Sequence, residues 1–244
     1  FGAKIFNFFS PNLKSNNFEW IPVINGNCNK TLNLLKENHS FKVHPIINKD
    51  KNIWDAMNLG IEKSVNEYLI FMNAGDRFYN KNILLKISDF IIENKHPDLI
   101  YGNTIEEIEK NKKKYKRSLN HKFIEYGMFA NHQSIFYKKN LFSDCNLKYD
   151  FENYPYAADY ALTAQIIKTK TNIKFINEYI SIFLSGGMSF SDKFLEEGRK
   201  EQIKIKQKIL KLNIFKVYFY YVIQLILWNI RKRFFKIYKL IRYK

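Results

Sequence analysis

Short apolar runs alternate with amphipathic segments from residue 19 onward, and this alternation constrains the fold more than any other feature of the chain. The apolar runs predict strands at 19–24, 42–47, 68–72 and 98–101. Between them, apolar residues at helical spacing predict helices at 30–38, 52–65 and 82–92. A strand–helix rhythm of this kind is typical of a doubly wound sheet. The sequence therefore predicts an α/β fold with a mostly parallel sheet flanked by helices.

Two features modify this pattern. Pro22 lies inside the first predicted strand and cannot donate to a strand ladder, which predicts an edge or distorted position for that strand. Residues 106–122 are highly charged and weakly periodic, so a solvated loop is expected there. Beyond this segment, strands are predicted at 133–137 and 173–184, with a helix at 157–168 between them.

The composition of the chain is that of a globular protein. With 244 residues, 46% of them hydrophobic, the chain can bury a sizeable core and does not resemble a disordered segment. Its first fifteen residues lack the sustained apolar stretch and small-residue cleavage site of a secretory signal. The two cysteines, Cys28 and Cys145, have no metal-ligand spacing, which disfavours a disulfide framework or a structural zinc site. A reducing cytoplasm is therefore the expected location.

The net charge of +17 is concentrated near the C-terminus, because residues 211–244 contain nine Lys or Arg and neither Asp nor Glu. A change in composition near residue 194 predicts a domain at 1–193 and a basic, amphipathic helical tail at 194–244. Basic surfaces also bind nucleic acids. The tail has no recognition motif, however, and the excess charge is not spread over the domain, so a nucleic-acid partner is the less favoured alternative.

The apolar part of the tail suits a membrane surface better than a membrane span. Its longest uncharged stretch is 217–230, fourteen residues, whereas a spanning helix needs about 20. Trp228 followed by Arg231, Lys232 and Arg233 is typical of a helix that lies in an anionic membrane surface. The alternative is a terminal helix that packs its apolar side on the domain and exposes its lysines.

A polar turn follows the apolar strand at 68–72 and marks the first candidate site. Asn73, Gly75 and Asp76 stand where a parallel strand would end, and ligands of doubly wound sheets bind outside the carboxyl ends of the strands. A carboxylate there can hold a hard divalent cation, which in turn can neutralise a substrate diphosphate. The alternative is an Asx turn that only starts the next helix.

The stretch "DKNIWDAMNLGIEKSVNEYLIFMNAGDRFY" (50–79) resembles a signature of bacterial family 2 glycosyltransferases, which have the GT-A fold, related to the Rossmann fold. Upstream, "FEWIPVINGNCNKTLNLL" (18–35) resembles the strand and Asp-rich turn of that family. Downstream, "NHQSIFYKKNLF", "YAADYALTAQI" and "SGGMS" follow in the expected order. The resemblance covers about residues 18–190. It implies transfer of a sugar from a nucleotide-sugar donor, with inversion.

The resemblance also implies roles for individual residues. Asp76 would be the ligand of a Mn²⁺ or Mg²⁺ ion that holds the donor diphosphate, and Asp159 would be the general base that deprotonates the acceptor. The residues implied on the nucleotide-sugar side are Asn25, Asp50, Asp55, Asn58 and Asn73. Those implied at the acceptor side or cleft are His132, Gln133 and Gly187.

Each role has a structural alternative. Asp55 and Asn58 are spaced as two neighbours on one helix face and could form an ordinary solvated stripe. His132 could be a hydrogen-bonded structural histidine, Gly187 part of a simple turn, and Asp159 a carboxylate at a helix start.

Three departures from the family pattern leave a further alternative open. The first strand of the family has no clear counterpart before residue 18, Asn25 and Asn29 replace two aspartates, and no Asp-x-Asp occurs in the chain. A truncated or inactive GT-A domain that serves as a membrane or complex scaffold would show the same features. The favoured expectation is an active hexosyltransferase-like enzyme of polysaccharide biosynthesis. We expect it on the inner face of the cell membrane, with a lipid-linked or cell-surface glycan acceptor.

Overall fold

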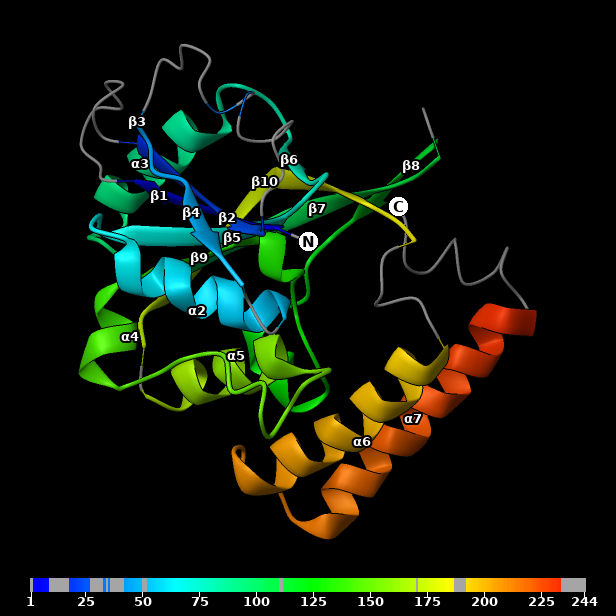
Figure 1. The fold of residues 1–244 in the computed structure, drawn as a ribbon. Coiled ribbons are helices and arrows are strands. Elements are labelled where there is room, and N and C mark those ends of the chain that lie inside the picture. Colours follow the sequence, from blue (N-terminus) through cyan, green and yellow to red (C-terminus); the bar gives the residue numbers. More distant parts are fainter. Residues whose placement is uncertain are drawn as a thin grey trace.

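The computed structural model describes residues 2–8, 18–26, 33, 35, 42–49, 52–109, 112–169, 171–186 and 192–233. Figure 1 shows one central sheet with helices on both of its faces, and a pair of C-terminal helices that extends away from the sheet. The helix predicted at 30–38 lies outside the described residues, apart from residues 33 and 35, which are helical.

Within the described residues, ten strands form the sheet. They are β1 (Gly2–Phe8), β2 (Phe18–Asn25), β3 (Lys42–Val43), β4 (Ile46–Asn48), β5 (Tyr68–Asn73), β6 (Arg77–Phe78), β7 (Leu99–Glu109), β8 (Lys112–Lys116), β9 (Ile135–Lys138) and β10 (Ile173–Leu184). Their order is β3-β2-β1-β5-β9-β7-β10-β6, while β4 pairs with β2 and β8 pairs with β7.

The directions of the strands correct the prediction of a mostly parallel sheet. Six strands, β2, β3, β4, β5, β7 and β10, run the same way. However, β1 lies antiparallel between β2 and β5, and β9 lies antiparallel between β5 and β7. Only β2–β3, β2–β4 and β7–β10 are therefore parallel pairs among the described strands. The alternation of strands and helices predicted the common direction of these six strands. It did not predict that β1 and β9 lie between them in the opposite direction.

The proline in β2 does not place that strand at an edge. β2 pairs with β1 on one side and with β3 and β4 on the other. On the second side, Trp20 is the last residue opposite β3 and Val23 is the first opposite β4. Pro22 lies between these two paired stretches. The sheet is thus interrupted near the residue that cannot donate a hydrogen bond, and the edge prediction is wrong.

The charged segment 106–122 is not a solvated loop throughout. Strand β7 continues to Glu109, and β8 returns beside it as an antiparallel partner. Glu106 and Lys116 form an ion pair of 2.9 Å across the two strands. Opposite charges on neighbouring strands stabilise such a hairpin, so the charges that suggested a loop are cross-strand partners.

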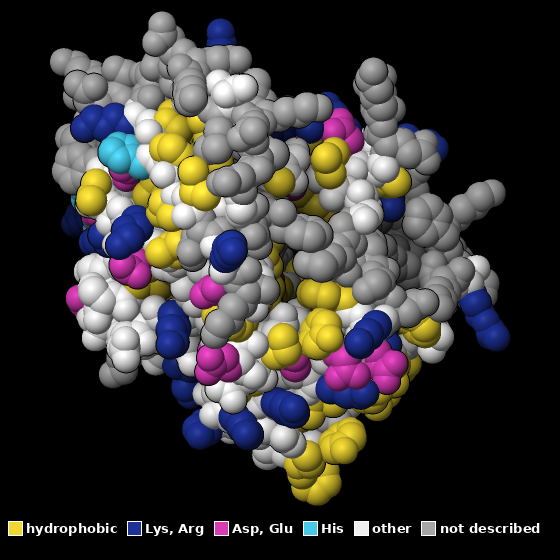
Figure 2. Space-filling view, viewed as in Figure 1, with side chains coloured by type: hydrophobic (Ala, Val, Ile, Leu, Met, Phe, Trp, Pro, Cys, Tyr) yellow, Lys and Arg dark blue, Asp and Glu magenta, His cyan; other side chains and the backbone are white. Residues whose placement is uncertain are grey.

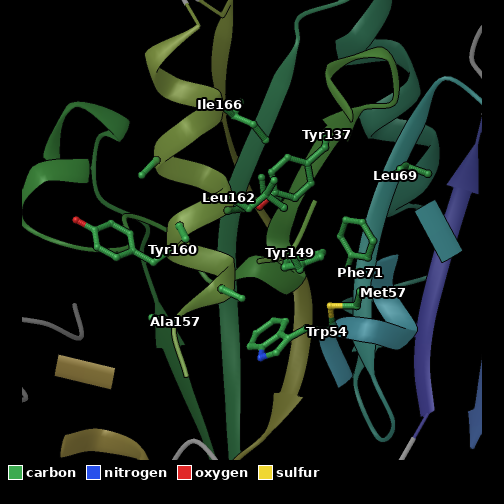
Figure 3. Packing of buried hydrophobic residues seen from close by; sticks show 14 of the residues in the cluster. Trp54, Met57, Leu69, Phe71, Tyr137, Tyr149, Ala157, Tyr160, Leu162 and Ile166 are labelled. Carbon is green, nitrogen blue, oxygen red and sulfur yellow. The ribbon is translucent and has the colours of Figure 1, made fainter. Parts of the chain in front are cut away.

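Among the described residues, one hydrophobic cluster lies on each face of the sheet. Successive side chains of a strand point to opposite faces, so β5 contributes side chains to both clusters. Leu69 and Phe71 belong to the cluster that contains α2 (Ile53–Lys63), α4 (Asn140–Asp144) and α5 (Ala158–Lys168). Tyr68, Ile70 and Met72 belong to the cluster that contains α3 (Ile83–Glu93). The helices predicted around 52–65, 82–92 and 157–168 are thus present. In Figure 3 the side chains of α2, β5, β9 and α5 converge in the first cluster.

The C-terminal part consists of two helices, α6 (Asp192–Lys208) and α7 (Ile214–Arg233), which lie side by side (Figure 1). The guanidinium of Arg199 on α6 lies 4.8 Å from the ring centroid of Trp228 on α7. We call this pair the C-terminal hairpin. Within the described residues, no helix has the length and apolar character needed to cross a membrane. Residues 234–244 of the predicted tail lie outside the described residues, and the proposed division at residue 194 stays a prediction.

Candidate functional site

The turn after β5 is closed by its own carboxylate. Asp76 Oδ2 accepts a hydrogen bond of 2.9 Å from the backbone N–H of Asn73, and the N–H of Asp76 donates to the Asn73 carbonyl at 3.1 Å. Gly75 has φ +95°, and a Cβ on it would lie 2.9 Å from Leu184 Cδ1, so the position requires glycine. The chain continues into β6 and not into a helix, so the expected alternative of an Asx turn starting the next helix is wrong.

Asp76 is almost fully buried, with 7% of its surface exposed. The Gln133 side-chain amide donates to Asp76 Oδ2 at 3.2 Å. Burial raises the pKa of Asp76. Backbone hydrogen bonds from Asn73 and Leu184, the Gln133 amide and the nearby His132 oppose that rise. The buried Oδ1 of Asn73 has no hydrogen-bond partner within the described part of the chain. The turn therefore presents a carboxylate and an unsatisfied amide oxygen.

The Asp76 carboxylate and the Asn73 amide oxygen suit a hard cation as ligands, but they are only part of a coordination shell. Carboxylate and amide oxygens are the ligands that Mg²⁺ and Mn²⁺ prefer. Among the described residues, however, no group of three or more His, Cys, Asp or Glu side chains could hold a metal ion. Mg²⁺ commonly takes one or two carboxylates from the protein and completes its coordination with substrate phosphates and water. The turn suits a cation bound jointly with a diphosphate, and that cation stays a prediction.

A second carboxylate, that of Asp159, lies near His132. His132 Nδ1 is 3.9 Å from Asp159 Oδ2, and Asp159 stands in the first turn of α5. Burial lowers the pKa of His132, and both Asp159 and Asp76 oppose this. Burial raises the pKa of Asp159, against the effect of His132 and of backbone hydrogen bonds. Asp76 and Asp159 thus both act electrostatically on one imidazole.

The imidazole of His132 is mostly buried. Its side chain is 12% exposed, and its Nε2 finds no hydrogen-bond partner among the residues that the structure describes. Buried polar atoms usually have such a partner, and the role of His132 stays a prediction. The ring of Trp54 on α2 lies 6.3 Å from the imidazole, centroid to centroid. Trp54 is absent from the residues that the sequence predicted for the site.

The predicted residues of α2 have different surroundings. Asn58 donates from its amide nitrogen to the Tyr149 carbonyl at 2.9 Å, and its amide oxygen accepts from the Tyr149 N–H at 2.8 Å. The amide therefore holds the segment before α5 against α2. Asp55 lies in the first turn of α2 and is partly exposed. The predicted contact of both residues with a nucleotide sugar stays untested.

The remaining predicted residues are placed in part. Asn25 ends β2 and Asn73 ends β5, and the two strands run in the same direction, so both residues stand at the carboxyl edge of the sheet. The structure thus brings together Asn73, Asp76, His132, Gln133 and Asp159. Asp50, Gly187 and the side chain of Asn25 lie outside what it describes.

The surface seen in Figure 2 carries Lys and Arg side chains interspersed with Asp and Glu. Hydrophobic side chains gather at one end of this face, over the turn between α6 and α7. Ile214 is 46% exposed and Phe215 is 84% exposed at the start of α7. This face therefore shows an apolar tip and not a continuous basic patch.

No family model matches the chain. Over 146 residues it is 29% identical to the "PGL/p-HBAD biosynthesis glycosyltransferase" of Mycobacterium bovis (strain BCG / Pasteur 1173P2). It shows the same identity to the protein of that name from Mycobacterium tuberculosis (strain ATCC 25177 / H37Ra). Each match covers 54% of this chain and 53% of the relative. The chain therefore spans about half the length of the curated relatives it matches, whose names support a glycosyltransferase.

Solved structures of TarS from S. aureus share the fold. TarS 1–349 in complex with UDP-GlcNAc aligns with a TM-score of 0.56 and 15% identity, over 78% of this chain and 62% of that one. The longer TarS structure aligns with a TM-score of 0.57 and 14% identity, over 81% of this chain and 35% of that one. At this identity the likeness establishes the mixed α/β fold.

Proposed function

We propose that this chain is a glycosyltransferase of the GT-A type that binds a nucleotide sugar at the carboxyl edge of its sheet. The observation that carries the proposal is the placement of Asp76 and Asp159, from distant parts of the sequence, around the buried His132. Two carboxylates at separate positions suit the two tasks of glycosyl transfer, holding the donor diphosphate and activating the acceptor. The names of the curated relatives support the same reaction class.

The donor side is proposed at the turn after β5. Asp76, with Asn73, would hold a Mn²⁺ or Mg²⁺ ion, which when bound neutralises the charge that develops on the leaving diphosphate. Gln133 fixes Asp76 Oδ2 through its 3.2 Å hydrogen bond. TarS structures with UDP-GlcNAc and with UDP support a nucleotide-sugar donor for this fold. We therefore propose a nucleoside diphosphate sugar as the donor.

The acceptor side is proposed at the start of α5. Asp159 would take the proton of an acceptor hydroxyl while the hydroxyl oxygen attacks the anomeric carbon and the bond to the diphosphate breaks, which inverts that carbon. Burial raises the pKa of Asp159 above the ordinary value of 3.8, and a more basic carboxylate is a better proton acceptor near neutral pH. The side chain is 25% exposed, so an acceptor can reach it.

We further propose that the chain works on a lipid-linked or cell-surface glycan at an anionic membrane surface. Helix α7 carries an outward stripe, which we define as Phe215, Tyr218, Phe219, Val222 and Ile226, each 49–84% exposed. Its spacing repeats every three to four residues, as on one face of a helix. No Asp or Glu follows Glu201 in the sequence. A second copy of this chain would place its own positively charged C-terminal region against this one, and the two would repel each other. An anionic lipid surface would instead attract the positive charge around the stripe.

The donor site is tested by thermal unfolding of the chain with UDP, GDP or dTDP, each with and without Mn²⁺. A ligand at about 100 times its dissociation constant stabilises a protein by about 2.7 kcal/mol, which shifts the melting temperature measurably. We expect one nucleotide to stabilise the chain only with Mn²⁺, and Asp76→Ala to remove that shift. Absence of any shift in the unsubstituted chain would contradict the donor site and favour the scaffold alternative.

A further inference from the structure

Helix α5, which carries Asp159, has no N-cap of its own. Its N-cap position is Ala157, which has no side chain able to accept a hydrogen bond from the first turn. The first N–H groups of a helix lack partners within the helix, and a cap typically contributes about 1 kcal/mol. Within the first turn, Asp159 itself accepts the N–H of Tyr160 at 2.8 Å. The N–H groups at and before the N-cap position need a partner from elsewhere in the fold.

Glu201 of α6 supplies that partner. Its Oε2 accepts hydrogen bonds from the backbone N–H of Tyr156 at 2.9 Å and from that of Ala157 at 2.8 Å. The residue is 6% exposed. Burial raises the pKa of Glu201, and the two N–H groups oppose that rise. A carboxylate at this end of a helix also interacts favourably with the helix dipole.

The segment before α5 is held from two sides. From α6, the ring of Phe194 makes an edge contact of 5.2 Å with that of Tyr156. From α2, Trp54 Nε1 donates to the Pro155 carbonyl at 2.8 Å. The same Trp54 lies beside His132. The start of α5 is thus fixed between the C-terminal hairpin and the helix next to the candidate site.

We propose that Glu201 is a positioning residue for the reaction, because it fixes the two residues that lead into α5, Tyr156 and Ala157, and with them the start of the helix that carries Asp159. The C-terminal hairpin is then part of the catalytic unit and not a separable tail. This inference rests on the proposed function in one respect, the role of Asp159 as the base. A displacement of about 1 Å of a reacting group can cost about 10²-fold in rate, so loss of the cap reduces turnover.

The test compares Glu201→Ala, Glu201→Asp and Glu201→Gln with the control Glu197→Ala. Glu197 stands one turn earlier on α6 and pairs with Lys200 at the surface. The measurements are kcat, KM for the donor, the shift in melting temperature with nucleotide and Mn²⁺, and amide hydrogen exchange. We expect Glu201→Ala and Glu201→Asp to lower kcat 10-fold or more, because they remove or withdraw the acceptor oxygen. Glu201→Gln retains an acceptor oxygen and most of the rate, and Glu197→Ala has no effect.

In the Ala and Asp variants we also expect faster exchange of the Tyr156 and Ala157 amides, with KM for the donor and the nucleotide shift unchanged. The positioning role would be overturned if Glu201→Ala and Glu201→Asp left kcat unchanged. It would also be overturned if these variants weakened donor binding by the same factor as they lowered kcat. If the unsubstituted chain transfers no sugar, the proposed function fails. The exchange measurement still decides the contact itself, because unchanged protection of both amides in Glu201→Ala and Glu201→Asp would show that Glu201 does not cap α5.

Discussion

At the level of single residues, the candidate site contains a buried carboxylate, Asp76, and a partly buried one, Asp159, and the two have different partners. Asp76 accepts hydrogen bonds from a backbone N–H and from Gln133, which leaves it suited to hold charge in place. The Asp159 side chain accepts a hydrogen bond of 2.8 Å from the backbone N–H of its neighbour Tyr160 and lies beside His132. The less constrained and more accessible carboxylate is the better candidate for proton transfer.

The general-base role of Asp159 predicts a specific pH dependence. The base must be ionised, and burial raises its pKa above 3.8, so kcat/KM should fall as the pH drops through this raised pKa. We expect Asp159→Asn to lower kcat by about 10²–10⁴-fold, the usual contribution of a general base, and to abolish this acidic limb. The pH profile of sugar transfer measures both effects.

Asp144→Asn is the matched control for that experiment. Asp144 ends α4, is exposed, and stands outside the candidate site. It should keep both the rate and the acidic limb of the unsubstituted chain. An Asp159→Asn variant that keeps the limb would assign the titrating group to another residue.

At the scale of elements, the β7–β8 hairpin depends on a buried charge and its partner. The Glu106 side chain is 2% exposed, and the Lys116 ammonium lies 2.9 Å away. Burial alone would raise the pKa of Glu106. Lys116 and the Ser185 hydroxyl outweigh this effect and hold the pKa below its usual value of 4.5. The pair therefore stabilises the fold above pH 4.5, and this contribution is lost as the pH falls through the lowered pKa.

Lys116→Met should destabilise the protein because it leaves Glu106 buried without its cation. Breaking a buried pair in this way typically costs about 3–5 kcal/mol. Urea unfolding at pH 7 measures the loss. The cost should shrink as the pH falls, because burial without Lys116 raises the pKa of Glu106 and the variant takes up a proton at a higher pH than the intact pair does. Adding Glu106→Gln should recover part of the loss.

Lys113→Met provides the comparison on the same strand. Lys113 is exposed and stands opposite Glu107, which pairs with Arg77. A surface substitution of this kind usually changes stability by less than about 0.5 kcal/mol. If Lys116→Met and Lys113→Met lower the free energy of unfolding equally, the Glu106–Lys116 pair does not stabilise the protein more than a surface lysine does.

At the scale of the whole molecule, the C-terminal hairpin faces two ways. On its inner side, Gln224 of α7 donates to the Tyr126 carbonyl at 2.6 Å, and Lys216 pairs with Glu125 at 2.5 Å. On its outer side lies the stripe from Phe215 to Ile226. The hairpin thus contacts the domain near the start of α5 and presents apolar side chains outward. Binding of the stripe to a surface would hold the acceptor side of the site near that surface.

Membrane binding through α7 is tested with vesicles of neutral lipid alone or with added phosphatidylglycerol. We expect binding to the anionic vesicles, weakening with salt because exposed charges are screened. Phe215→Ser with Phe219→Ser should reduce binding at least 10-fold, since burial of one such side chain contributes about 1.5–3 kcal/mol. Val65→Ser, at a 76% exposed position away from the hairpin, is the control. Undiminished binding of the double variant would exclude the stripe as the contact.

Elements with a strong local signal could be predicted from the sequence. Alternating apolar periods located β5, α2, α3 and α5, and the polar turn at Asn73 and Asp76 follows directly from the end of an apolar strand. The resemblance in the same stretch indicated the reaction class that the names of the relatives support. These inferences succeeded because hydrophobic period and turn chemistry are encoded within about ten residues.

Contacts between distant segments could not be predicted in this way and are seen first in the folded chain. The fold placed reversed strands beside β5, paired the charges of β7 with those of β8, and brought Gln133 to Asp76 and Glu201 to the start of α5. A carboxylate that caps a helix from 44 residues away has no local sequence signal. Strand direction and buried polar partners are set by the packing of the whole sheet and its helices, and that information is not carried by the period of any single segment.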